Sequence, residues 1–353
     1  MNFLFIKLLS RIMALVVTLT FPAAAWQVGG SDNYFYHWDQ AALYSSAEYA
    51  TEIEKDPDSD FVILNVSDIQ LFSVNSVLFG EWFAEKTLDI LVEKVHPDLI
   101  TLSGDNEWGA TACLKMIEAI DSYGIPWAPI MGNHDRNFVI SQFWVAYNLY
   151  KAENCIFEFG PDNMGYGNYI INITQNSKTI HTLFMMDTHA DIDVKYGEGL
   201  TERQLEWYKW AVEGIKEENG TVVESSVIMH IPTPEYADAW KSVHDESGNL
   251  IEPYADAPFC YCLESISYPD RNVGFFSLCK ELGSTKNIIV GHDHVNCFSI
   301  DYEGITLTYA MKLGLGGYFD VRLNGGTVLT VDSDGKTQTD YVYVDPMSVI
   351  KSK

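Results

Sequence analysis

The chain is poor in positive charge. It contains 22 Lys and Arg residues against 49 Asp and Glu residues, and its formal net charge is −27. A negative field of this size repels nucleic acid and anionic membranes, so neither is predicted as a partner. An anionic substrate would have to be attracted locally, and bound cations would supply that attraction.

Long apolar segments are also lacking, apart from one near the start. Lys7 and Arg11 precede an apolar stretch over residues 12–21, and Ala23-Ala24-Ala25 offers a small-residue cleavage site. This is the pattern of a secretory signal peptide. The stretch is shorter than the roughly 20 residues of a bilayer span. We therefore expect residues 1–25 to be a signal peptide and the remaining chain to be secreted or extracytoplasmic.

The chain has no linker rich in Pro, Gly or Ser, no low-complexity tract and no repeat that would divide it. Cleavage after residue 25 leaves 328 residues with a formal charge of −29, enough for one large domain or two ordinary ones. Because the polar clusters described below extend from residue 68 to residue 294, we expect one domain over residues 26–353. The oligomeric state is left open.

Cysteines are few, and they form an even set of six. In an oxidising compartment some of them could form disulfides, and six cysteines allow 15 connectivities. The alternative is buried free thiols, above all for Cys113, which lies in a helical pattern. The pair Cys260 and Cys262 lacks the spacing of a zinc knuckle, so we assign it no metal.

Apolar periodicity predicts alternating strands and helices in the first half of the chain. Strands are expected over residues 61–66, 99–102 and 127–131, and helices over residues 82–95 and 110–123. The second half is richer in strands, expected over residues 168–173, 179–186, 222–229, 287–290 and 300–331, with a helix over residues 201–218. A long loop that rims the site is expected between His230 and Gly274. The alternation indicates an α/β protein with a mixed or parallel sheet.

Five short polar clusters each follow a predicted strand. They are Asp68-Ile69-Gln70, Gly104-Asp105-Asn106, Gly132-Asn133-His134-Asp135, His230 and Gly291-His292-Asp293-His294. Open α/β sheets gather their ligand sites at the carboxyl ends of strands, so we expect these clusters to form one pocket. Taken singly, Asp68 and Asp105 could be helix caps and His230 a core histidine; the ordered set favours a site.

The combination of residue types suits two metal ions. Hydrolysis of a phosphoester requires a nucleophilic oxygen to approach an anionic phosphorus while the departing oxygen is stabilised. Two cations about 3.5–4 Å apart serve both needs, and such a pair requires a shared carboxylate together with imidazoles and amide oxygens. The five clusters supply these groups.

The clusters resemble the motifs of the calcineurin-like metallophosphoesterase superfamily, which run Asp-x-His, Gly-Asp, Gly-Asn-His-Asp/Glu, His and Gly-His-x-His. The sequences His230-Ile231-Pro232-x-Pro234-Glu235-Tyr236 and Gly291-His292-Asp293-His294-Val295-Asn296 are similar to its purple-acid-phosphatase-related branch. The resemblance covers roughly residues 60–325. It implies the α/β fold of that superfamily, a four-layer β-sandwich flanked by helices.

The resemblance also implies a role for each site residue. The proposed metal ligands are Asp68, Gln70 and His294 for the first metal, Asp105 as the bridge, and Asn133, His230 and His292 for the second metal. His134 would protonate the leaving oxygen or donate to the phosphate, and Asp135 would orient His134. Nitrogen and oxygen ligands without thiolate suit two divalent or mixed-valence ions of manganese, zinc or iron.

Gln70 is a departure, because the commoner motif has His at this position. A neutral amide oxygen is a weaker donor than imidazole for borderline cations and relatively better for Mn²⁺, which weakens the prediction of iron. Two hypotheses follow. The first is an exported phosphoric ester hydrolase, a phosphatase or phosphodiesterase of small phosphorylated substrates, that uses a metal-bridging hydroxide. The alternative is a non-catalytic binding protein with a decayed metal site.

Overall fold

The computed structural model describes residues 34–72, 80–135, 140–190, 193 and 195–351. The predicted signal peptide lies outside these residues. Within the described part of the chain, no helix combines the length and the apolar character that crossing a bilayer requires.

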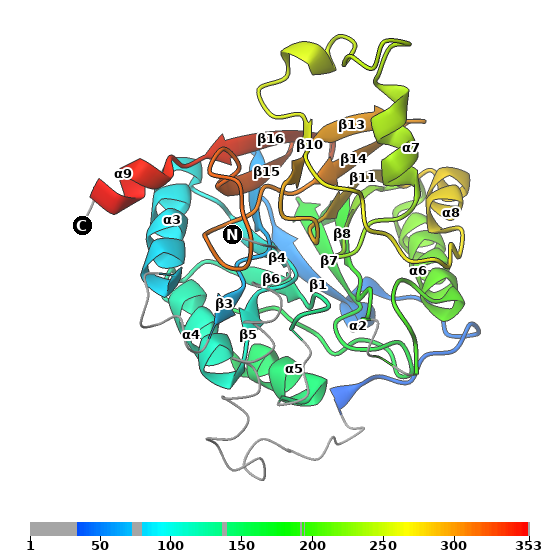
Figure 1. The fold of residues 1–353 in the computed structure, drawn as a ribbon. Coiled ribbons are helices and arrows are strands. Elements are labelled where there is room, and N and C mark those ends of the chain that lie inside the picture. The colour runs from blue at the N-terminus through cyan, green and yellow to red at the C-terminus, as the bar shows by residue number, and fades with distance from the viewer. Residues whose placement is uncertain (1–33, 73–79, 136–139, 191–192, 194, 352–353) are drawn as a thin grey trace.

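Two β-sheets form the centre of the molecule (Figure 1). The first has five strands, in the order β16 (Thr337–Tyr343), β15 (Gly325–Val331), β2 (Phe61–Val66), β4 (Leu99–Ser103) and β6 (Trp127–Ile130). The last three strands run parallel to one another, and β15 is antiparallel to β2 and β16. The carboxyl ends of β2, β4 and β6 therefore meet at one edge of the sheet.

The second sheet has seven strands. Their order is β1 (Ala50–Glu54), β7 (Tyr169–Gln175), β8 (Lys178–Met185), β9 (Glu224–Ile228), β11 (Thr285–Val290), β14 (Ile305–Tyr309) and β13 (Ser299–Tyr302). The central strands β8, β9, β11 and β14 are parallel. Two further sheets have two short strands each. They pair β3 (Leu71–Phe72) with β5 (Glu107–Trp108), and β10 (Tyr261–Cys262) with β12 (Asn296–Cys297).

Helices cover the outer face of each sheet (Figure 1). On the side of the five-stranded sheet lie α3 (Gly80–Val95), α4 (Ala110–Asp121) and α5 (Gln142–Lys151), and α3 packs on β2 and β15. On the other side, α6 (Glu202–Asn219), α7 (Glu235–Ser242) and α8 (Phe275–Leu282) pack on β8, β13 and β11 respectively. The remaining helical segments are α2 (Ser46–Tyr49), η4 (Tyr254–Asp256) and α9 (Pro346–Lys351). The predicted four-layer arrangement is confirmed.

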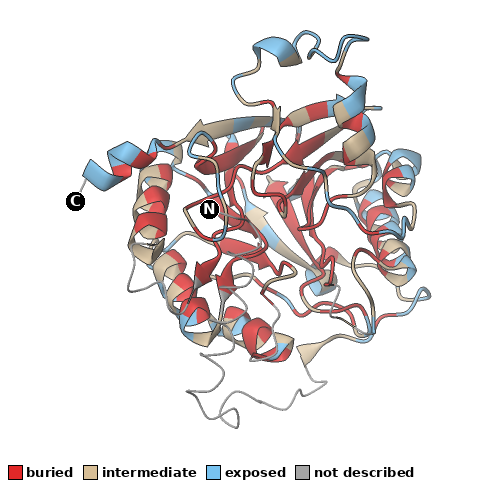
Figure 2. Cartoon of the chain, viewed as in Figure 1, coloured by how far each residue is buried: buried red, intermediate tan, exposed pale blue. Residues whose placement is uncertain are grey.

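Local sequence accounts for these elements. The strand β2 is buried along almost its whole length, as expected of a strand between two layers. Helix α6 begins at a capping box, in which Thr201 accepts from the Gln204 N–H and Gln204 bonds back, and it ends at Gly220 in the left-handed region. Its buried face includes Trp207 and Tyr208. Figure 2 shows the resulting pattern, with buried strands inside and exposed residues on the outer faces of the helices.

The structure contains helices that the sequence prediction did not include, among them α5, α7 and α8. The stretch after His230 is not one continuous loop, because it contains α7 and the short strand β10. Helix α7 has eight residues and buries only Tyr236 and Ala239 among its hydrophobic positions, too few to form a recognisable helical period. All six cysteines are free thiols, and Cys113 is fully buried.

Candidate metal centre

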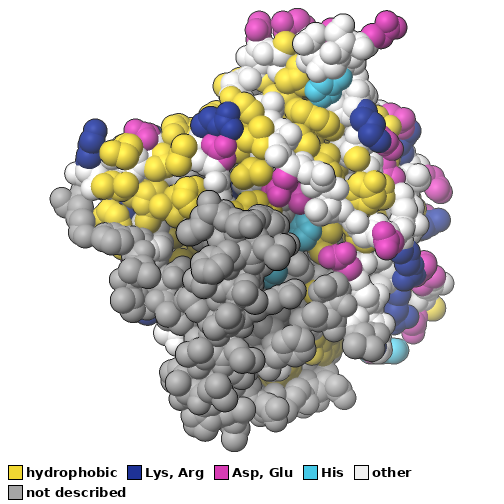
Figure 3. Space-filling model, viewed as in Figure 1, with side chains coloured by type: hydrophobic (Ala, Val, Ile, Leu, Met, Phe, Trp, Pro, Cys, Tyr) yellow, Lys and Arg dark blue, Asp and Glu magenta, His cyan; other side chains and the backbone are white. Residues whose placement is uncertain are grey.

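The five polar clusters come together where the carboxyl ends of strands from both sheets meet. Asp68 follows β2 and Asp105 follows β4, whereas His230 follows β9 of the other sheet. These three side chains are almost fully buried. Figure 3 shows histidine and acidic side chains gathered in the middle of this face of the molecule.

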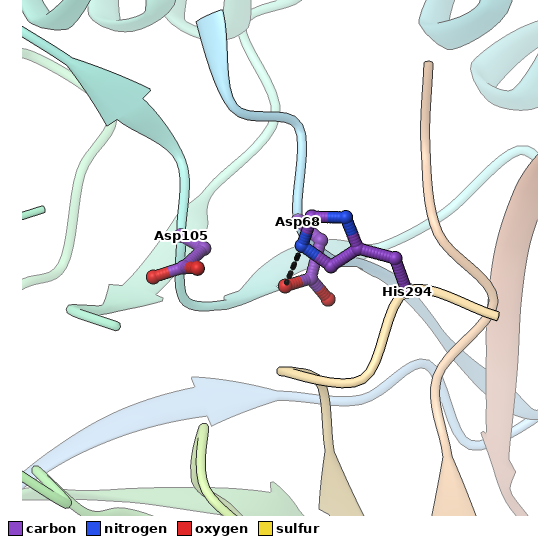
Figure 4. A group of neighbouring side chains, drawn as sticks. All are labelled: Asp68, Asp105 and His294. Carbon is purple, nitrogen blue, oxygen red and sulfur yellow. Dashed lines mark ion pairs between the residues drawn. The ribbon is translucent and has the colours of Figure 1, made fainter. Parts of the chain in front are cut away.

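Asp68, Asp105 and His294 form the first group of donor atoms (Figure 4). Their ligand atoms all lie within 4.8 Å of one another, and His294 Nε2 is 3.6 Å from Asp68 Oδ1. Among the described residues, no other set of three His, Cys, Asp or Glu side chains meets this criterion. Gln70 adjoins the group, since its Nε2 donates to Asp105 Oδ2 at 3.0 Å.

A second group lies on the other side of Asp105. His230 Nε2 is 3.3 Å from Asp105 Oδ1 and 3.0 Å from Asn133 Oδ1. His292 Nδ1 is 3.2 Å from the same amide oxygen. One Asp105 oxygen therefore faces Gln70 and the other faces His230, so this carboxylate stands between the two groups.

Backbone carbonyl groups orient two of the imidazoles. His230 Nδ1 lies 2.8 Å from the carbonyl oxygen of Ser103, and His294 Nδ1 lies 2.8 Å from that of Tyr318. Donation from Nδ1–H to a carbonyl directs Nε2 into the site, where it can bind a metal ion once it is unprotonated. Burial lowers the pKa of His292 to about 3 and that of His294 well below its ordinary value, so both are neutral and able to act as ligands.

Burial and neighbouring charges shift the pKa values of the two buried carboxylates and of His230. Burial and the charge of Asp105 raise the pKa of Asp68. Burial opposes ionisation of Asp105 as well, but His230 and His134 outweigh it and hold the pKa of Asp105 well below its usual range. Burial would lower the pKa of His230, yet Asp105 and Asp68 raise it to about 9. A donor set of carboxylate oxygens and imidazole nitrogens with this demand for cations fits manganese, zinc or iron.

Strained backbone accompanies the donor groups. Asp68, Gln70, Asp105 and His292 all adopt positive φ, at 54°, 46°, 54° and 80°. Each such conformation costs about 1–3 kcal/mol and is typical of functional sites. Gly104, at φ 93°, permits His230 to lie against the backbone, because a Cβ atom there would lie 2.6 Å from His230 Nδ1.

His134 lies at the edge of the two groups rather than inside them. Its backbone N–H donates to Asp105 Oδ1 at 2.8 Å, while its Nε2 is 4.0 Å from Asp105 Oδ2. The His134 side chain is 43% exposed. It is thus placed to meet a molecule that enters from solvent.

Asp135, which the resemblance predicts to orient His134, has described contacts with the loops after β4 and β6. Its buried carboxylate accepts hydrogen bonds from the backbone N–H groups of Gly132, Asn106 and Glu107, and from the Asn106 side-chain amide. These four bonds brace the loops after β4 and β6 against each other. Sequence adjacency to His134 does not reveal these four contacts.

Lys312 is a member of the site that no sequence motif indicated. Its buried ammonium group donates to the backbone carbonyl of Asp68. Burial lowers the pKa of Lys312 to about 8, although Asp68 and Asp105 oppose the change. Lys312 follows a strand in a Gly-rich segment, and only its position against the loop after β2 connects it with the site.

A two-sheet α/β sandwich with oxygen and imidazole donors between its strand ends is typical of metal-dependent hydrolases. The sequence profile of the calcineurin-like phosphoesterase family matches residues 61–296. The chain belongs to this family, and the predicted resemblance is confirmed. The folds of this family and of purple acid phosphatases use dinuclear metal centres.

Several known proteins are similar to the chain. "Probable inactive purple acid phosphatase 14" of Arabidopsis thaliana is 28% identical over 306 residues, which cover 75% of this chain and 73% of that protein. "Phosphatase DCR2" of Saccharomyces cerevisiae is 26% identical over 311 residues, which cover 76% of this chain but only 50% of the yeast protein. The crystal structure of a dimetal phosphatase from Danio rerio covers 80% of this chain and 95% of its own, with a TM-score of 0.50 and 11% identity. This last likeness shows the fold alone.

The position of Asp135 generates a stability prediction. In Asp135→Asn the amide NH₂ would face backbone donors, so unfolding free energy should fall by about 1–3 kcal/mol, the cost of unsatisfied buried groups. Urea denaturation followed by circular dichroism measures the loss. The exposed Asp301→Asn variant is the control and should retain wild-type stability. Wild-type stability in Asp135→Asn would contradict the bracing role.

Proposed function

We propose that this protein is a metal-dependent phosphoric ester hydrolase with two metal ions at the site between the sheets. The observation that carries the proposal is the position of Asp105, whose two carboxylate oxygens face different donor groups. A shared carboxylate is what a two-metal site requires. When bound, the two ions would neutralise phosphate oxygens and lower the pKa of a water molecule between them.

The donor groups suggest how the chain would hold the ions. Asp68, Gln70 and His294 would bind the first with Asp105, and Asn133, His230 and His292 would bind the second. The Gln70 amide nitrogen points at Asp105, so a turn about the last side-chain bond would direct Oε1 to the same place. Because a glutamine oxygen is a harder donor than imidazole, Mn²⁺ is the best candidate for the first position, with zinc or iron as alternatives.

The chain's own groups would complete the reaction. Lys312 would hold the loop of Asp68 through its backbone carbonyl. His134, partly exposed beside Asp105, would donate a proton to the leaving oxygen. The substrate would be a small phosphorylated molecule. We also propose that residues 1–25 direct export and that residues 26–353 form one domain.

A non-catalytic role is the alternative. It is favoured by Gln70 and by the word "inactive" in the names of the Arabidopsis relatives. The yeast relative, in contrast, is named a phosphatase. A decaying site would be expected to lose several groups, yet Asp105, Asn133, His134 and both histidines after β11 are present and converge. This convergence supports the enzyme.

Asp105→Asn tests the shared carboxylate. The substitution removes a negative charge between two dications, so the purified protein should lose metal and all measurable phosphatase activity. Metal analysis by mass spectrometry and turnover of a nitrophenyl phosphate measure the two effects. Asp301→Asn, at an exposed position on β13, should keep both properties. Two bound metals with near-normal turnover in Asp105→Asn would refute the assignment.

His134→Ala tests the proton donor. Because His134 is assigned to chemistry rather than coordination, the variant should keep its metal and lose roughly 10²–10⁴ in rate. The loss should be greater for an alkyl phosphate than for a nitrophenyl ester, whose leaving group hardly needs a proton. Equal losses for the two esters, or loss of metal, would remove His134 from this role.

Substitutions of Gln70 distinguish a functional metal site from a decayed one. Gln70→Ala should lower the affinity for the first metal ion more than that for the second, and excess Mn²⁺ should partly restore activity. Gln70→His, which adds a nitrogen donor, should keep or raise affinity and shift the preference toward zinc or iron. Metal titration and turnover of the wild type and both variants measure these effects. An inert Gln70→Ala substitution would exclude Gln70 as a ligand.

A further inference from the structure

The long segment between α7 and α8 returns to the metal centre at β10. This strand pairs antiparallel with β12, so that Cys262 lies opposite Asn296. Just beyond β10, the Glu264 N–H donates to the Asn296 side-chain oxygen at 3.2 Å. Glu264 is thereby held beside the loop that carries His292 and His294.

The carboxylate of Glu264 joins two loops. Glu264 Oε1 accepts the backbone N–H of Val295, the residue after His294, at 3.1 Å. Its two oxygens also receive the hydroxyl of Tyr318, at 2.9 and 2.8 Å. Tyr318 belongs to the Gly-rich segment after β14. One half-buried carboxylate therefore connects three segments that are far apart in the sequence.

Tyr318 in turn holds His294 at two points. The two rings are stacked, with centroids 4.1 Å apart and an interplanar angle of 15°. The backbone carbonyl of Tyr318 accepts the Nδ1–H of His294 at 2.8 Å. These contacts fix both the tilt of the imidazole and the nitrogen that points toward Asp68. His230 of the second group is oriented instead by Ser103.

We propose that Glu264 and Tyr318 act as positioning residues that set the affinity of the first metal ion, but not the second, by fixing His294. The inference rests on the proposed two-metal function. Groups that orient a ligand usually contribute about 10- to 100-fold to metal affinity, because a freely rotating imidazole must be ordered when the metal binds. The segment after α7 thereby becomes part of the first metal position, although it supplies no ligand.

Tyr318→Phe is the central variant. It keeps the ring and the backbone carbonyl and removes only the hydroxyl that bonds to Glu264. Glu264→Ala should behave in the same way. Glu264→Gln retains an acceptor oxygen, so it should keep most of the wild-type affinity for the first metal ion. The matched control is Tyr343→Phe, because the Tyr343 hydroxyl bonds to the Val321 carbonyl on the exposed surface.

The first measurement is Mn²⁺ and Zn²⁺ affinity by competition with a chelator. Tyr318→Phe and Glu264→Ala should lower the affinity for one of the two ions about tenfold. The affinity for the other ion should stay within about twofold of the wild-type value. Combination with Gln70→Ala identifies the weakened ion as the first, since the two effects should fall on the same ion. Unchanged affinities, or equal weakening of both ions, would overturn the proposal.

Hydrogen exchange of the metal-free protein supplies a readout that does not require metal or activity. Backbone amides in residues 291–297 should exchange faster in Tyr318→Phe and Glu264→Ala than in the wild type or Tyr343→Phe. Unchanged exchange would show that the contacts do not hold His294, which overturns the proposal. If the wild type bound no metal, the proposed function would fail and the metal part of the inference with it. Faster exchange would then still support the positioning of His294 by Glu264 and Tyr318.

Discussion

The close approach of two buried carboxylates, Asp68 and Asp105, is the constraint on which the rest of the site depends. Like charges at this depth repel strongly, because little water is present to screen them. Neighbouring positive groups offset that repulsion. His230 lies against Asp105, and the ammonium of Lys312 lies against the loop of Asp68. A pair of metal ions would satisfy the same demand more fully, which is why the donor set supports a metallophosphoesterase.

The backbone around these carboxylates is arranged at a cost. Asp68 and Asp105 both occupy the left-handed region. At Gly104 and Gly132 there is no room for a side chain, because a Cβ atom would clash with His230 and Asp105 respectively. The well-packed sheets on both sides supply the stability that maintains such loops. Rigid strands and strained loops together place oxygen and nitrogen donors within a few ångströms, as binding of compact metal ions requires.

Family membership sets the reaction type more firmly than the substrate. The calcineurin-like fold supplies the donor loops, whereas the segments that rim the site decide what can enter. In this chain one of those segments, between α7 and α8, also contacts the loop of His294 through Glu264. Differences among relatives in this segment would therefore affect metal binding as well as substrate choice. This connection offers a physical route by which related chains with similar motifs could differ in activity.

Much of the fold follows from the sequence alone. The apolar runs predicted β2, β4, β6, β11 and helices α3, α4 and α6 to within a few residues, because burial between layers imposes a period that local sequence records. The five polar clusters likewise predicted which strand ends would form the site. Helix α7 was missed, since a short helix with few buried residues carries little periodic signal.

The sequence by itself determined the donor types and their order; only the tertiary structure decided where the supporting side chains point. Asp135 is adjacent to His134, yet its carboxylate braces backbone N–H groups of two loops. Lys312 reaches Asp68 across 244 residues of sequence. The Asp135 contacts join two loops of the five-stranded sheet, whereas the Lys312 contact joins loops that follow strands of different sheets. A local pattern records which face of an element is buried, but not which distant residue will meet it there.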